Sequence, residues 1–152
     1  MKIAVSSDTR THLVDAILED LGNRGHEIEY FGPEPGKEVD WPVVTLEAAE
    51  RVARGEAEQA IVMCWTGTGA TLAANKVPGI RAALCRDAET AKGARIWNHA
   101  NVLGLSLRAT PEAVAKEILS VWFETPLSND EWNLRQMQRI REAEQRYGTL
   151  GK

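Results

Sequence analysis

A continuous apolar run, Ala60 to Cys64, constrains the fold of this chain more than any other feature of its sequence. A strand with apolar side chains on both faces is typical of a parallel sheet, because helices cover both sides of such a sheet. Shorter runs of similar character recur along the chain, at Lys2–Ser6, Glu27–Phe31, Ala82–Cys85 and Val102–Leu105. Helical patterns separate these runs, and this alternation predicts the α/β class.

The segments between the runs carry apolar residues at helical spacing, first seen from Leu13 to Leu21. Further helices are predicted over residues 41–54, 89–97, 110–123 and about 129–147. Thr110 with Pro111 is a typical helix start, and Ser128 with Glu131 indicates a capping box for the last helix. The expected fold is a three-layer, Rossmann-like, doubly wound sheet of five parallel strands with an extra C-terminal helix.

Composition restricts the class of protein. The length of 152 residues suits one domain over residues 1–152. The net charge is -4. Charges of both signs are mixed, so no basic face for nucleic acid is expected. No apolar stretch approaches the roughly 20 residues of a membrane-spanning helix. Two cysteines, Cys64 and Cys85, and scattered histidines predict neither a disulfide framework nor a metal site. We therefore expect a cytoplasmic protein.

Polar residues gather where the predicted strands end. Asp8 and Arg10 follow the first strand, and Cys64 leads into the turn Trp65-Thr66-Gly67-Thr68-Gly69 after the third. In doubly wound folds, ligands bind beyond the carboxyl ends of the strands, where N–H groups of the following helices point outward. The turn does not match a dinucleotide fingerprint, since Leu72 takes the place of the third glycine. Cys64 could act as a thiolate at this helix start, or could simply be a small buried apolar residue.

A long motif resembles a known family. Thr66-Gly67-Thr68-Gly69, followed by the stretch Ala73 to Cys85, is similar to the signature of the sugar-phosphate isomerases that include type B ribose-5-phosphate isomerase and the galactose-6-phosphate isomerase subunits. The similarity continues along nearly the whole chain, at Asp8, residues 40–42, 91–92, Asn98, residues 100–103 and Arg108. The resemblance implies a Rossmann-like domain that forms a homodimer or a dimer of dimers. It also implies an active site at the subunit boundary, a sugar phosphate as substrate, and no cofactor.

The resemblance assigns roles to several residues, because this family moves a proton between adjacent carbons through a cis-enediolate. Cys64 would be the base, and the backbone amides of residues 67–69 would hold the negative oxygen that forms. Asp8 and Asn98 would orient substrate hydroxyls, while Thr66 would bond a hydroxyl or assist ring opening. Asp8 could instead cap the first helix, and Asn98 could end its own helix.

Several positions depart from the family pattern. Trp97 replaces the histidine that opens the sugar ring, and Thr9 replaces a histidine that binds phosphate. Trp65 stands where a glycine is usual, and Trp41 where a tyrosine is usual. Tryptophan side chains are therefore expected at the pocket. His99, two residues beyond Trp97, could recover the ring-opening role.

The cations that bind the phosphate also differ from the family pattern. The family's arginine pair falls on Glu131 and Arg135, so the first position reverses its charge. Arg135 and Arg139 keep a spacing of four residues, which places both on one helix face. Arg10, beside the start of the first helix, could replace the missing cation, and Arg108 is expected to contact the substrate. The last helix, about residues 129–147, is expected to pack on a partner subunit.

These replacements predict an open-chain substrate. A four-carbon sugar with phosphate on O4 cannot close a furanose ring, so it needs no ring-opening histidine. The preferred interpretation is an aldose–ketose isomerase for a tetrose or tetrulose 4-phosphate, with ribose 5-phosphate as the near alternative. A subunit that needs a related partner chain is a second interpretation. A flavodoxin-like FMN-binding module is the least favoured, because no Ser/Thr-rich phosphate loop follows the first strand.

Overall fold

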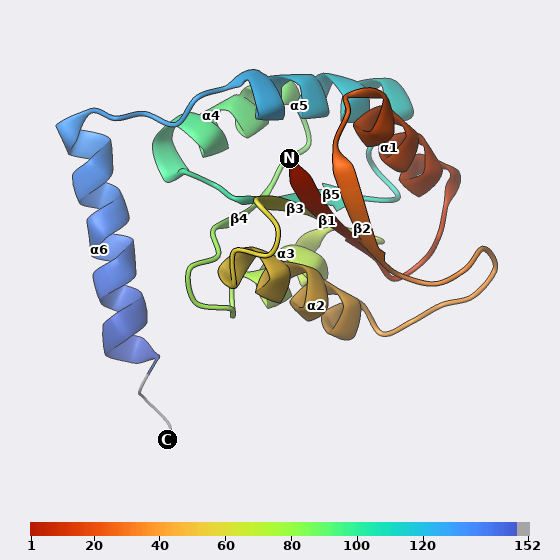
Figure 1. Cartoon of the computed structure of the whole chain (residues 1–152), viewed down its shortest axis with the longest axis horizontal. Helices are drawn as coiled ribbons and strands as arrows, with labels where there is room; N and C mark the ends of the chain where they lie inside the picture. Colours follow the sequence, from red (N-terminus) through yellow and green to blue (C-terminus); the bar gives the residue numbers. More distant parts are fainter. Residues whose placement is uncertain (149–152) are drawn as a thin grey trace.

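The computed structural model describes residues 1–148 and shows an all-parallel sheet with helices on both faces (Figure 1). The strands are β1 (Lys2–Ser7), β2 (Glu27–Phe31), β3 (Gln59–Cys64), β4 (Ala82–Leu84) and β5 (Val102–Ser106). They lie in the order β2-β1-β3-β5-β4, so β1 and β3 are neighbours in the middle of the sheet. The winding reverses between β1 and β3, and ligands bind at the carboxyl edge of such a switch point. The predicted three-layer α/β fold is confirmed.

Three helices cover one face of the sheet and two cover the other (Figure 1). The first group comprises α1 (His12–Asn23), α4 (Ala88–Asn98) and α5 (Glu112–Glu124), and the second comprises α2 (Trp41–Ala53) and α3 (Thr68–Ala74). Alternate residues of β3 face the two layers: Ile61 and Met63 join the aliphatic cluster under the first group, and Ala60 and Val62 join the smaller cluster under the second. Both faces of β3 are therefore buried, which explains its continuous apolar sequence.

Two helix starts differ from those predicted. Pro111 itself is the residue before α5, and no side chain caps that helix. The last helix is capped by Asp130, whose Oδ1 accepts a hydrogen bond of 2.9 Å from the Asn133 N–H, rather than by the predicted Ser128. Ser128 lies two residues before this cap, and its hydroxyl donates to the Asp130 carboxylate and does not cap a helix N–H. A nearby carboxylate thus displaced the hydroxyl as the cap.

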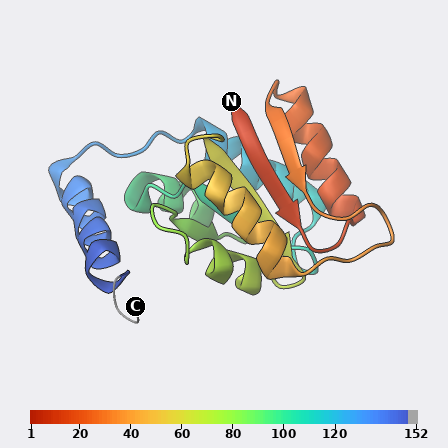
Figure 2. The same cartoon turned by 60° about the horizontal axis from the view of Figure 1, so that its bottom comes forward.

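The predicted C-terminal helix is α6 (Glu131–Tyr147), which stands apart from the sheet at the end of an extended segment, away from the arrowhead of β1 (Figures 1 and 2). It meets the rest of the chain through the buried side chains of Asn133 and Met137, and through Glu144, whose Oε1 accepts a 3.0 Å hydrogen bond from the Gly79 N–H. Most other residues of α6 are exposed. No helix among the described residues is long and apolar enough to cross a membrane.

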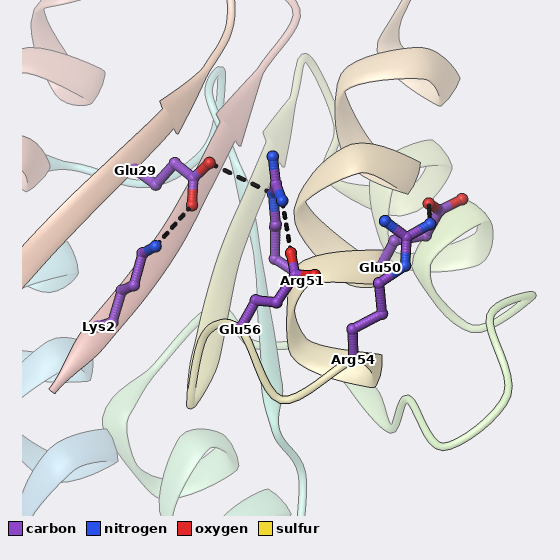
Figure 3. A network of polar contacts seen from close by, with 6 residues as sticks. All are labelled: Lys2, Glu29, Glu50, Arg51, Arg54 and Glu56. Atoms are coloured by element: carbon purple, nitrogen blue, oxygen red, sulfur yellow. Dashed lines mark hydrogen bonds and ion pairs between the residues drawn. The ribbon is translucent and has the colours of Figure 1, made fainter.

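Ion pairs fasten α2 to the edge of the sheet (Figure 3). Glu29 of β2 pairs with Lys2 of β1 at 3.2 Å and with Arg51 of α2 at 3.3 Å. Arg51 also pairs with Glu56 at 2.5 Å, just beyond the end of α2. Because these side chains are partly exposed, water screens the pairs and their contribution to stability is small, so the buried clusters remain the main source of stability.

Candidate active site

Two adjoining hollows open at the carboxyl edge of β1 and β3. The first measures about 310 Å³ and is lined by Asp8, Trp41, Cys64, Trp65, Thr66, Thr68 and Gly69. The second measures about 360 Å³ and is lined by Asp8, Thr9, Glu38, Val39, Asp40, Trp41 and Trp65. Three residues are common to both hollows, so together they form one depression. We call it the Cys64 hollow after the cysteine in its lining.

Cys64 is the last residue of β3, and only 5% of its surface is exposed. Its Sγ accepts a hydrogen bond of 3.4 Å from the Ala70 N–H in the first turn of α3. An N–H group at the start of a helix favours negative charge on a sulfur that it contacts. Cys85, in contrast, is buried just after β4, and burial raises the pKa of its thiol to about 12. Cys85 is therefore a neutral thiol at physiological pH.

The turn after Cys64 depends on Gly67. This residue has φ of 74° in the left-handed region, where glycine is favoured, and a Cβ there would lie 2.8 Å from the Leu105 carbonyl oxygen. The Gly67 N–H donates to the Cys64 carbonyl at 3.2 Å, so it is not available to a substrate. The backbone N–H groups of Thr68 and Gly69 donate to no acceptor within the described residues, while the Thr68 hydroxyl shares a 2.7 Å hydrogen bond with the Thr66 hydroxyl. Of the three backbone amides predicted to hold the oxyanion, those of Thr68 and Gly69 are therefore free and that of Gly67 is not.

Asp8 follows β1 and enters the Cys64 hollow beside the thiol. Its Oδ1 is buried without a hydrogen-bond partner, and burial raises the pKa of its carboxyl. The alternative role of Asp8 as a cap for α1 is not seen, because that helix begins at His12 after Thr11. The Asp8 carbonyl accepts a 3.1 Å hydrogen bond from the Val39 N–H. This bond holds the segment before α2 at the border of the hollow.

Other predicted site residues lie at the opposite edge of the sheet. Helix α4 connects β4 to β5 and runs from the carboxyl edge of the sheet back to the amino edge. Its last two residues are Trp97 and Asn98, and His99 follows them. Asn98 is the last helical residue, and His99 follows it with φ of 48° and Nε2 at 2.7 Å from the Ser128 carbonyl oxygen. Arg135 and Arg139 are exposed on α6. One chain therefore does not bring these residues to Cys64.

Comparison with known proteins decides the family. Residues 3–142 match the family described as Ribose/Galactose Isomerase. The chain belongs to this family. The isomerase is 33% identical over 126 residues to the D-erythrulose-4-phosphate isomerase of Pectobacterium atrosepticum, across 82% of this chain and 83% of that protein. It is 36% identical over 106 residues to ribose-5-phosphate isomerase B of Escherichia coli, across 70% and 71% of the two chains.

A solved structure agrees with this assignment. The ribose-5-phosphate isomerase B of Clostridium thermocellum superposes with a TM-score of 0.91 at 37% identity, covering 97% of this isomerase and 99% of that chain. The interpretation of the chain as an aldose–ketose sugar-phosphate isomerase is thereby confirmed.

Some features of the isomerase site could not be read from the sequence. Arg10 is held elsewhere: its Nε donates to Asp15 at 2.8 Å and its guanidinium lies 5.1 Å from the centre of the Tyr30 ring. Glu38 reaches the hollow because residues 9 and 38 form an isolated antiparallel bridge. The hydrogen bond to Cys64 comes from the backbone N–H of Ala70, so the type of residue at position 70 does not indicate it. These contacts depend on tertiary structure, so local sequence pattern does not reveal them.

Proposed function

We propose that this isomerase interconverts a tetrose 4-phosphate and a tetrulose 4-phosphate in the Cys64 hollow. The observation that carries the proposal is the small space beside Cys64. The part of the Cys64 hollow that contains the thiol measures about 310 Å³ and has the indoles of Trp41 and Trp65 at its border, so this part alone lies at the lower end of the roughly 300–1,000 Å³ of small-molecule pockets. A relative named for D-erythrulose 4-phosphate supports a four-carbon substrate, whereas relatives named for ribose 5-phosphate support the alternative.

The residues at the hollow suit proton transfer through an enediolate. Cys64, as a thiolate, would remove the proton from the carbon beside the carbonyl, and the bond electrons would move onto the carbonyl oxygen. The free amides of Thr68 and Gly69 would then hold that oxygen. The proton of the adjacent hydroxyl would pass to that oxygen, and the Cys64 thiol would return its own proton to the former carbonyl carbon, which regenerates the thiolate and yields the isomeric carbonyl compound. Asp8, beside the thiol, would accept hydrogen bonds from substrate hydroxyls.

A second copy of the chain would supply the residues that lie far from Cys64. Trp97 and Trp132 are 59% and 60% exposed and border a groove of about 400 Å³ with Asn98, Gln136 and Met137. Large exposed indoles on neighbouring helices are typical of a protein interface. We infer that the isomerase forms at least a homodimer in a cytoplasmic setting, in which the end of α4 and helix α6 of one subunit approach the Cys64 hollow of the other.

Turnover of the purified chain on four-, five- and six-carbon sugar phosphates tests the proposed function. Cys64→Ser should lower kcat by about 10²–10⁴-fold, because the general base is lost. The matched control is Cys85→Ala, which removes the buried neutral thiol and should retain turnover. Near-normal kcat in a well-folded Cys64→Ser protein would remove Cys64 from the mechanism. A folded wild-type chain that is inactive on every sugar phosphate would favour the second interpretation, a subunit that needs a related partner.

Substrate length is tested with two tryptophan variants. The wild type should give its highest kcat/KM on open-chain four-carbon phosphates and a lower value on ribose 5-phosphate. Trp65→Gly removes the exposed indole beside Cys64 and should shift the preference toward five carbons. Trp97→His should help ribose 5-phosphate only if ring opening limits turnover. A wild-type preference for five or six carbons would contradict the short-substrate proposal and leave the isomerase assignment intact.

A further inference from the structure

The backbone at the end of α4 has an unusual conformation. His99 follows Asn98 with φ of 48° and ψ of 38°, and it is the one residue other than glycine among residues 1–148 that has a positive φ. The Ala100 N–H then donates to the Ala94 carbonyl at 3.0 Å, which closes the helix end. Glycine usually occupies such a left-handed position, because a Cβ there crowds the backbone. Contacts with neighbouring segments must therefore hold His99 in this conformation. We call residues 98–100 the His99 turn.

Arg81, just before β4, makes the first of these contacts. Its Nε donates a 2.9 Å hydrogen bond to the His99 carbonyl, and its Nη1 donates one of 3.2 Å to the Gly79 carbonyl. Arg81 forms no ion pair with a carboxylate among residues 1–148. Its positive charge instead lies at the carbonyl end of α4, where the helix dipole is negative. The guanidinium thus fastens the His99 turn to the segment before β4.

The imidazole of His99 makes the second contact. Its Nε2 lies 2.7 Å from the carbonyl oxygen of Ser128, in the segment that leads to α6. A carbonyl oxygen only accepts hydrogen bonds, so Nε2 carries a proton and donates it. The Ser128 N–H in turn donates to the Ile96 carbonyl at 3.3 Å. The ring therefore links the end of α4 to the segment before α6, and its Nε2 has no free lone pair with which to take a proton from a substrate.

We propose that His99 and Arg81 are positioning residues, which hold the left-handed turn that sets the direction of Trp97 and Asn98 at the end of α4. The inference rests on the proposed function, in which the end of α4 approaches the Cys64 hollow of a second copy. Trp97 and Asn98 are both exposed and border the groove beside α6. A different backbone at His99 would move these two side chains relative to that hollow. This role is an alternative to the ring-opening role of His99.

Three replacements of His99 separate the two roles. All of them remove the ring, but glycine and asparagine adopt a left-handed backbone far more readily than alanine. A positioning role predicts that His99→Ala lowers kcat/KM at least fivefold more than His99→Gly or His99→Asn, on open-chain four-carbon phosphates and on ribose 5-phosphate alike. A ring-opening role predicts equal losses in the three variants, confined to ribose 5-phosphate. That second result would overturn the inference.

Arg81 is tested by rescue. Arg81→Lys keeps the charge but loses the planar fork that reaches both carbonyls, so kcat/KM should fall at least fivefold. In the double variant with His99→Gly, the turn no longer needs the guanidinium, and the loss should not exceed that of His99→Gly alone. The control is Arg24→Lys, which alters a partly buried arginine bonded to Asp20 and Ser120 at the end of α1 and should retain wild-type kcat/KM. Additive losses in the double variant would remove Arg81 from this role.

Two measurements without turnover keep this inference separate from the proposed function. Nitrogen NMR of the wild type should show a protonated Nε2 on His99, and His99→Ala should melt about 2–4 °C below His99→Gly. Both results in a chain without isomerase activity would keep the His99 turn as described and reject the proposed function. An unprotonated Nε2, or a melting temperature of His99→Ala equal to or above that of His99→Gly, would overturn the inference whatever the activity.

Discussion

Asp8 is a residue whose position opposes folding. Its Oδ1 is buried without a partner, and burial raises the pKa of its carboxyl. A carboxyl with a raised pKa in the native state destabilises that state whenever the pH is high enough to ionise it. The destabilisation disappears as the pH falls, because the group is then protonated in both the native and the unfolded states. Such a residue is expected where function, rather than stability, requires the charge.

Replacement of Asp8 separates the two effects. Asp8→Asn should raise the melting temperature at pH 7, since the amide has no charge to desolvate, and the gain should vanish below about pH 3.9, the ordinary pKa of aspartate. The same change should lower kcat/KM by about 10-fold or more, because substrate hydroxyls lose a charged acceptor. Thermal unfolding at several pH values and steady-state kinetics measure both. A variant that is less stable at pH 7 and fully active would contradict this account.

At the scale of elements, the unit formed by β3, its turn and α3 places the groups that we propose to react. The short helix α3 follows Cys64 after only three residues, and its first turn supplies the N–H that contacts the sulfur. Gly67 makes this tight connection possible through its left-handed backbone and its contact with β5. The position of the Cys64 sulfur relative to the free amides thus depends on one backbone conformation.

Substitution of Gly67 tests that dependence. Gly67→Ala should lower the free energy of unfolding by about 1–3 kcal/mol, because its Cβ would lie 2.8 Å from the Leu105 carbonyl oxygen in addition to the left-handed strain. The control is Gly36→Ala, where φ is 78° and no atom lies within 4 Å of the new Cβ. Urea unfolding measures both variants. Equal losses in the two variants would show that steric contact at Gly67 is unimportant.

Sequence pattern predicts the elements better than the contacts between them. The apolar run of β3 could be recognised because both of its faces are buried, and Gly67 because the family motif contains it. The cap of α6 could not, since Asp130 and Ser128 are equally suitable by type and only the folded backbone chooses between them. The loss of the Gly67 amide to the Cys64 carbonyl likewise depends on turn geometry.

At the scale of the whole molecule, the predicted site residues fall into two groups at opposite edges of the sheet. Asp8, Cys64 and Thr66 lie at the carboxyl edge, whereas Trp97 and the residues after it lie at the amino edge. Helix α6, which follows the second group in the chain, adds exposed apolar side chains that include Leu134 and Ile140. A monomer would keep the two groups apart and leave these apolar side chains exposed.

Association should therefore accompany activity. We expect sedimentation velocity to show at least a dimer, and specific activity to fall on dilution into the range where the dimer dissociates. Trp132→Lys, in the groove beside Trp97, should weaken association at least tenfold. Gln138→Lys adds the same charge to an exposed position on another face of α6 and is the control. A strict monomer with full activity at low concentration would contradict the shared site.

The pairing of β1 with β3 also affects how the enzyme acquires its activity. Asp8 and Cys64 meet only because Ser7 of β1 lies opposite Met63 of β3, although these two residues are far apart in the chain. Contacts between distant segments form slowly during folding, because a long loop must close first. A refolding chain can thus regain its helices well before the hollow exists. Recovery of catalysis after dilution from denaturant should consequently lag behind recovery of helical circular dichroism. The length of this lag would measure how slowly β1 pairs with β3.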